Sequence, residues 1–132
     1  MVIKAGIIAG FCLAAPAFFS MASAQEMWSG IIPDAFPGIN YQWSLNEDGT
    51  YIETGQYRSS QQPAQTPLSG TWQLTNDVLS LTQDSYGYTF KGRVADDRIL
   101  GTLYSYGQPI SAFCAKKGDE APFDCKTGDM IS

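Results

Sequence analysis

The chain has 132 residues, with 8 basic and 13 acidic residues, no histidine, and a formal net charge of −5 at pH 7. This acidic balance, without a long basic run, argues against nucleic acid and anionic membrane surfaces as partners. The lack of histidine excludes Ser-His-Asp and Cys-His catalysis and any imidazole metal site.

Residues 1–24 have the features of a signal peptide. Lys4 gives a positive start, an apolar run extends from Ala5 to Phe19, and Ala22-Ser23-Ala24 is a small-x-small cleavage site before Gln25. The apolar run is too short and too rich in Gly and Ala for a membrane span. We therefore expect export, cleavage, and no stable membrane insertion of the mature chain.

The mature chain would be residues 25–132, one domain of about 108 residues in the periplasm or secreted from the cell. Cleavage leaves 7 basic and 13 acidic residues, a formal net charge of −6. Cys12 leaves with the signal peptide, and Phe11 stands before it where a lipoprotein signal needs a small residue, so lipidation is not expected.

The stretch from Glu26 to Gly38 contains two prolines and two glycines, which forbid a long helix. We expect its apolar side chains to cover one end of the core; the alternative is that Trp28–Ile32 pairs as an additional strand. A β pattern begins at Ile39, where Tyr41, Trp43 and Leu45 alternate with polar residues.

Asn46 to Gly49 predicts a hairpin loop, and Thr50–Tyr57 is the returning strand. The phase of this strand is ambiguous, because either Tyr51 and Glu53 face the interior or Ile52 does. An inward Glu53 would be a carboxylate in an aromatic cavity. We favour the other phase, in which Glu53 lies on the surface.

Arg58 to Leu68 has two prolines and no periodicity, and predicts a long extended surface loop. Two hairpins follow. In the first, Asn76-Asp77 is a two-residue turn that tolerates positive φ. It predicts these cross-strand pairs on one face: Thr75 with Val78, Leu74 with Leu79, and Trp72 with Leu81.

The second hairpin turns within Ala95–Arg98. It predicts that Val94 pairs with Ile99, Gly92 with Gly101, and Phe90 with Leu103. Gln108-Pro109 predicts the last turn, and Pro109–Cys114 the last strand.

Cys114 and Cys125 remain after cleavage, 11 residues apart near the C-terminus. In an oxidising compartment this pair predicts one structural disulfide rather than a redox pair, which usually has Cys-x-x-Cys spacing.

Seven or eight short antiparallel strands rich in Trp and Tyr predict an all-β fold, a single closed up-and-down barrel or meander with a C-terminal tail tied by the disulfide. Three elements carry a resemblance to small bacterial lipocalin-like, calycin-type exported domains over residues 40–114. They are Tyr-x-Trp-x-Leu-x-x-Asp-Gly-Thr-Tyr from Tyr41 to Tyr51, Gly-Thr-Trp-x-Leu from Gly70 to Leu74, and the Phe90–Leu103 hairpin. The resemblance implies a barrel that holds a small ligand or plugs a partner enzyme.

The sequence predicts no enzyme, no catalytic residues, no cofactor and no metal site. The acidic pairs lie in predicted turns or loops, and none has the spacing of a calcium loop. The alternative left open is a glycosidase pair made of two carboxylates that are distant in sequence.

The candidate ligand-binding residues are aromatic, and they either line a cavity in the barrel mouth or simply fill the core. They are Trp43, Tyr51, Trp72, Tyr88, Phe90 and Tyr104. Plain core is the more frequent role of such residues in a small barrel.

Two functions fit these features. The first is an exported binding or interaction protein that holds a small apolar or aromatic ligand or docks on an envelope protein. The alternative is an inhibitor of a periplasmic or secreted hydrolase, such as a protease or a lysozyme-like enzyme, that acts through the 58–68 loop.

Overall fold

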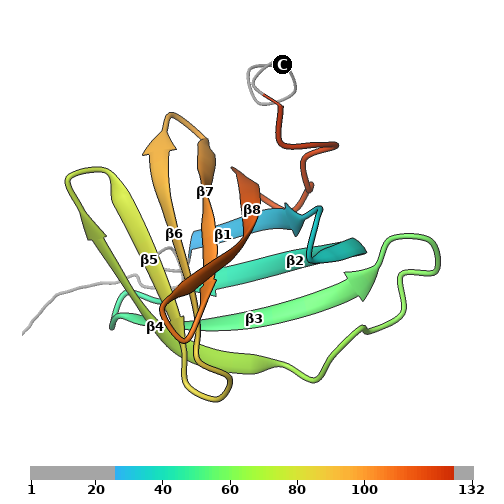
Figure 1. The fold of residues 1–132 in the computed structure, drawn as a ribbon, viewed down its shortest axis with the longest axis horizontal. Coiled ribbons are helices and arrows are strands. Elements are labelled where there is room, and N and C mark those ends of the chain that lie inside the picture. Colours follow the sequence, from blue (N-terminus) through green and yellow to red (C-terminus); the bar gives the residue numbers. More distant parts are fainter. Residues whose placement is uncertain (1–25, 127–132) are drawn as a thin grey trace, which may run out of the picture.

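The computed structural model describes residues 26–126, which form eight antiparallel strands closed into one barrel (Figure 1). Each strand pairs with its neighbours in sequence, and β1 pairs with β8 to close the barrel. The predicted signal peptide and Cys12 lie outside the described residues. The strands are β1 Glu26–Ile32, β2 Phe36–Leu45, β3 Thr50–Tyr57, β4 Leu68–Thr75, β5 Val78–Gln83, β6 Tyr88–Ala95, β7 Arg98–Ser105 and β8 Gln108–Lys117.

The predicted all-β barrel is confirmed, and the two central hairpins have the predicted register. Asn76 and Asp77 adopt positive φ values of 52° and 66°, as the two-residue turn requires. Thr75 pairs with Val78 across this turn. In the next hairpin Gly92 pairs with Gly101, and the other predicted pairs are present in both hairpins.

The segment that was expected to cover one end of the core is instead a full strand. β1 pairs with β2, where Trp28 lies opposite Trp43, and with β8, where Ile31 lies opposite Cys114. The glycine of this segment explains the difference. Gly30 lies where a Cβ would come within 2.7 Å of the Trp43 ring, so its missing side chain leaves room for that ring while β1 pairs with β2.

The last turn also lies elsewhere than predicted. Tyr106 and Gly107, with φ values of 49° and 82°, form the turn, and Gln108 and Pro109 already belong to β8. Pro109 is tolerated there because it faces Tyr104 at an irregularity in the β7–β8 register.

The expected phase of β3 was wrong, because Glu53 faces the interior. Leu45 pairs with Tyr51, so five residues rather than four lie between the first paired residues of the hairpin. This single-residue shift places Glu53 beside buried Trp43 and leaves Ile52 40% exposed.

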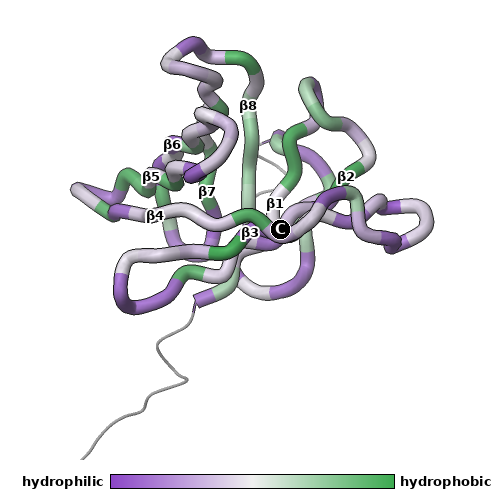
Figure 2. The backbone as a smooth tube through the Cα atoms, turned by 90° about the horizontal axis from the view of Figure 1, so that it is seen from below, coloured by the Kyte–Doolittle hydropathy of each residue, from purple (hydrophilic) through white to green (hydrophobic). Residues whose placement is uncertain are grey.

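The core lies in the barrel interior and consists mainly of aromatic and branched aliphatic side chains. Hydrophilic residues are most continuous in the loops that project from the barrel (Figure 2). The buried cluster comprises Trp28, Ile32, Tyr41, Trp43, Leu45, Tyr51, Leu79, Leu81, Phe90, Ile99, Leu103, Phe113 and Ala115.

The predicted disulfide is confirmed between Cys114 in β8 and Cys125 in the tail, with Cα atoms 5.4 Å apart. Cys114 is fully buried beside Ile31, and Ala121 packs against the same small cluster. The bridge therefore holds the tail against the outer side of the β1–β8 seam. No helix in the described part of the chain is long and apolar enough to cross a membrane.

Candidate functional site

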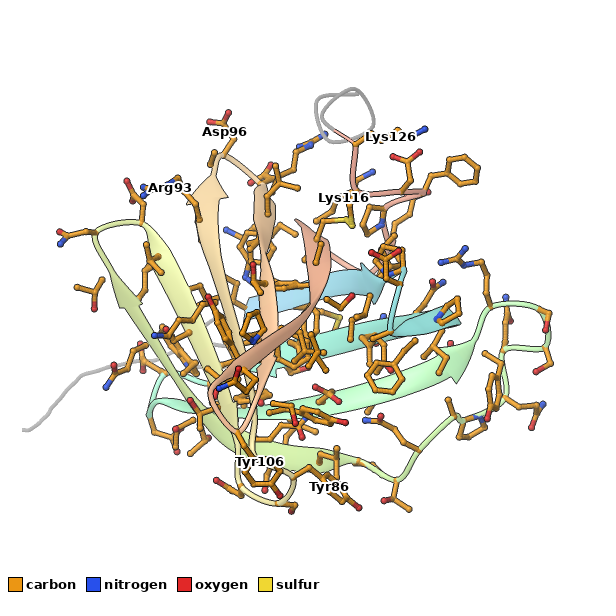
Figure 3. The ribbon with its side chains drawn as sticks, viewed as in Figure 1. Tyr86, Arg93, Asp96, Tyr106, Lys116 and Lys126 are labelled. Atoms are coloured by element: carbon orange, nitrogen blue, oxygen red, sulfur yellow. A yellow bond between two sulfur atoms is a disulfide. The ribbon has the colours of Figure 1, made fainter. Side chains whose placement is uncertain are left out.

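One end of the barrel, here called the mouth, is formed by four connections: residues 33–35, 58–67, 84–87 and 106–107. Figure 3 places Tyr86 and Tyr106 together at this end and Arg93 and Asp96 at the opposite end. The mouth contains a cavity of about 260 Å³. Its lining residues come from β1 to β7, from the 58–67 loop and from the 84–87 connection. They are Ile32, Phe36, Tyr41, Glu53, Gln65, Thr66, Leu68, Gln83, Tyr86, Tyr88, Phe90 and Leu103.

The floor of the cavity is built around Glu53, whose side chain is 2% exposed. The Trp43 indole donates a hydrogen bond to Glu53 Oε1 over 2.9 Å. Gln83 Nε2 donates to both carboxylate oxygens, at 3.0 and 3.1 Å, and Gln65 Nε2 donates to Oε2 at 3.0 Å. Strands β2, β3 and β5 and the 58–67 loop therefore meet at one carboxylate.

Local structure explains how these groups converge. Trp43 and Glu53 are directly paired across β2 and β3, so their side chains lie side by side on the interior face. Gln83 is the last residue of β5 and pairs with Gly70, which in turn pairs with Tyr51, two residues before Glu53 in β3. A buried indole N–H usually needs an acceptor, and Glu53 provides one.

The 58–67 loop folds back over the mouth. Ala64 N donates to the Gly55 carbonyl at 2.8 Å, and Pro63 bridges to Gln56. These contacts hold Gln65 and Thr66 against the cavity. The long loop was predicted, but its role in lining the cavity was not.

Two of the six aromatic candidates, Tyr88 and Phe90, line the cavity. Trp43 and Tyr51 are fully buried in the core and do not line it. Trp72 donates its indole N–H to the Asn46 carbonyl over 2.8 Å, at the end of the barrel opposite the mouth. Tyr104 contributes to a separate hollow with Thr89 and Lys91.

The residues that sequence reasoning missed are mainly the polar ones, Gln65 and Gln83, together with Glu53, which was expected on the surface. The indole of Trp43 carried the only usable signal, because a tryptophan in the middle of a core strand needs a hydrogen-bond acceptor nearby. No sequence pattern marks which glutamines approach that acceptor.

The chemistry of the cavity favours binding. Its polar groups are one carboxylate, two amides, a threonine hydroxyl and three tyrosine phenols. Burial raises the pKa of Tyr41 above its ordinary value, and the adjacent Glu53 raises it further, so this phenol stays protonated. Glu53 is the only acid in the lining, so the cavity lacks the pair of carboxylates that most glycoside hydrolases use. Across residues 26–126 no group of three or more His, Cys, Asp or Glu side chains is placed to hold a metal ion.

In a comparison with protein families, residues 28–112 match the NlpE N-terminal domain. This segment covers more than half of the chain and contains every residue that lines the cavity. The comparison with curated proteins gave no match. The comparison with solved structures also gave none.

Proposed function

The chain belongs to the NlpE N-terminal domain family, a family of envelope lipoprotein domains, and we propose that it is an exported, non-enzymatic, lipocalin-like protein that binds a small, largely apolar ligand in the mouth of its barrel. The proposal includes removal of residues 1–24 as a signal peptide and location of the mature domain, residues 25–132, in the periplasm or outside the cell.

The observation that carries the proposal is the cavity itself. Small barrels of this size are commonly filled by their own side chains, whereas this barrel keeps about 260 Å³ open at the mouth. Apolar walls with a few fixed polar groups are the usual composition of a small-molecule site. Phe36, Tyr88 and Phe90 supply the walls, and Glu53 with its amide partners supplies the polar groups.

NMR titration of the ¹⁵N-labelled protein with 2-phenylethanol, a small neutral aromatic probe, tests the proposal. Three side-chain N–H signals report directly on the cavity floor: the Trp43 indole and the Gln65 and Gln83 amides. We expect saturable shifts of these signals. The Trp72 indole, at the opposite end of the barrel, should not shift.

A pair of variants locates the binding. Thr66→Trp places a large ring at the rim of the cavity from an exposed position, and it should abolish the shifts. Ser60→Trp adds the same ring to the same loop away from the cavity, and it should leave them unchanged. If both variants showed the same shifts on titration, the cavity would be excluded as the binding site.

The second candidate function, inhibition of an envelope hydrolase, is favoured by the tip of the 58–67 loop. Residues 58–63 are exposed, yet the backbone hydrogen bonds Gln61 N to Tyr57 O (2.7 Å) and Tyr57 N to Gln62 O (2.9 Å) fix their conformation. A fixed, protruding loop suits insertion into a partner's cleft.

This candidate is tested by the double variant Arg58→Ala, Gln62→Ala, which changes the loop tip and keeps Gln65 at the cavity. Pull-down from the envelope fraction of the native host should lose a captured hydrolase with this variant and retain it with Thr66→Trp. Capture that depends on Thr66 rather than on the tip would contradict insertion of the loop.

A further inference from the structure

The carboxylate on the floor of the cavity is not balanced by a cation. All three side chains that donate to Glu53 are uncharged, and the lining contains no Lys or Arg. Burial of an ionised carboxylate is costly unless a positive group accompanies it. The floor of this cavity therefore has the electrostatic character of an anionic subsite.

The walls reinforce this character. Phe36, Tyr41, Tyr86, Tyr88 and Phe90 all border the same space as Glu53. Aromatic rings present a negative π face, and a cation close to several of them is attracted by their quadrupoles. Phe36 and Tyr88 meet edge to face, with ring centroids 6.2 Å apart, so the two rings form a corner of the wall.

A second acceptor lies beside the carboxylate. Gln83 is 6% exposed, and its Oε1 is buried without a hydrogen-bond partner. The amide cannot simply be turned around, because its Nε2 donates to both oxygens of Glu53 and an oxygen in that place would be repelled. Gln83 Oε1 is thus an acceptor that only an additional donor can satisfy.

The last feature is an exchangeable donor. Gln65 comes from the 58–67 loop and is half-buried, while Trp43 is fixed in the core. The Gln65 amide donates to Glu53 Oε2 from the side of the loop. A charged N–H donor forms a stronger bond to a carboxylate than a neutral amide does, so such a donor can replace Gln65 at Oε2.

From these features we propose that the cavity binds a small organic ammonium ion, with Glu53 as its counter-ion, Gln83 Oε1 as a second acceptor and the aromatic walls around its apolar part. The inference rests on the proposed function and specifies its ligand class. A site of about 150 Å³ holds benzene, so about 260 Å³ corresponds to roughly ten non-hydrogen atoms, the size of an arylalkylamine.

The test is a charge series on one scaffold: 2-phenylethylammonium, neutral 2-phenylethanol and anionic phenylacetate, each titrated by NMR with the same side-chain reporters. We expect the ammonium ion to bind about tenfold more tightly than the alcohol, and phenylacetate to bind more weakly than both. Equal affinity of the ammonium ion and the alcohol would overturn the inference and leave the proposed function standing. No shift with any of the three probes would overturn both.

Variants assign the preference to the named groups. Glu53→Gln keeps the shape of the side chain and should bring the ammonium ion and the alcohol to within about twofold of each other. Asp34→Asn makes the same change of net charge in the exposed β1–β2 connection, outside the lining, and should leave the tenfold preference intact. If both variants lowered the preference for the ammonium ion over the alcohol equally, that preference would come from long-range attraction by an acidic protein. This result would contradict the role of Glu53 as the specific counter-ion.

A third variant keeps the inference testable if Glu53→Gln does not fold. Tyr86 is 55% exposed and lines the cavity, so Tyr86→Leu should fold. The variant should weaken the binding of the ammonium ion more than that of the alcohol, because it removes an aromatic π face and keeps an apolar side chain. A parallel loss for both probes would contradict the cation–π contribution.

Discussion

Gly101→Ala tests whether the paired glycines of β6 and β7 set the spacing of these strands. A Cβ on Gly101 would overlap the Lys91 carbonyl oxygen, and it would lie 2.5 Å from Gly92 Cα and 2.7 Å from Phe113 Cε1. Two of these three atoms belong to the backbone of β6, so no side-chain rotation relieves the overlap. The strands must separate, or the Phe113 ring must leave its place over the glycines.

Overpacking of this kind costs about 1–3 kcal/mol, and an obstacle made of backbone places Gly101→Ala near the upper end. The smaller entropy of the unfolded alanine chain offsets about 0.4–1 kcal/mol. We therefore expect a net loss of about 2 kcal/mol, which for a domain of this size lowers Tm by roughly 10 °C.

Urea unfolding followed by circular dichroism measures the loss, with Gly55→Ala as the matched control. A Cβ on Gly55 would lie 3.2 Å and 3.3 Å from the Tyr41 ring and 3.4 Å from Gln65 Cδ, which are all side-chain atoms that can shift. Gly55→Ala should cost less than about 1 kcal/mol. Equal stability of the two variants would refute the view that strand spacing depends on Gly101.

Three further predictions concern the core, the tail and one ion pair. Trp43→Phe removes the indole donor to Glu53 and leaves space between the rings of Phe90 and Phe113, whose centroids lie 5.0 and 5.9 Å from that of Trp43. In urea unfolding it should lower the free energy of unfolding by about 2–3 kcal/mol. A change below about 0.5 kcal/mol would contradict a stabilising role of the buried hydrogen bond. Cys125→Ser opens a loop with a sequence separation of 11 and should lower the free energy of unfolding by up to about 3 kcal/mol, because the unfolded chain gains loop-closure entropy. If reduction of the disulfide left the urea midpoint unchanged, the bridged tail would add nothing to the stability of the barrel. Burial alone raises the pKa of Glu26, but the Trp28 hydrogen bond and the Lys117 ammonium, 3.0 Å away, outweigh it and hold the pKa below the ordinary 4.5. Lys117→Met should raise the pKa of Glu26 in a carboxylate NMR titration and lower the free energy of unfolding by about 0.5 kcal/mol at neutral pH. Since the pKa of Glu26 in the folded protein is depressed, the difference in stability between variant and parent should vanish as the pH falls through that pKa. A difference that persists at lower pH would exclude this ion pair as its source.

The parts of the fold that were predictable from sequence are those with short, chemically specific turns. The two-residue turn Asn76-Asp77 fixes the register in which β4 pairs with β5. The turn between β6 and β7 is equally short, and it fixes the pairing of Gly92 with Gly101. Between β2 and β3, Leu45 pairs with Tyr51, one residue later than the pairing with Thr50 that a four-residue loop suggested. That shift decides the phase of β3, because the side-chain period of a strand is two.

The site was less predictable than the fold because its members are distant in sequence. Glu53 and Gln83 are 30 residues apart, and Gln65 lies in a loop without periodicity. Each residue alone reads as an ordinary polar side chain. They come together only when β2, β3, β4 and β5 pair in the correct register, and that register depends on the phase of β3.

The cavity and the loop tip, which carry the two candidate functions, are connected through Gln65. This residue follows the fixed tip by a few positions and reaches Glu53 in the cavity floor. A ligand cation that replaces Gln65 at Oε2 would free one of the contacts that hold the loop over the mouth. A partner that recognises the tip would then bind the loaded and empty forms with different affinities, and by linkage the partner would change the affinity for the ligand by the same factor. Gln65→Ala, which removes the connection and leaves both surfaces in place, should make the two binding events independent.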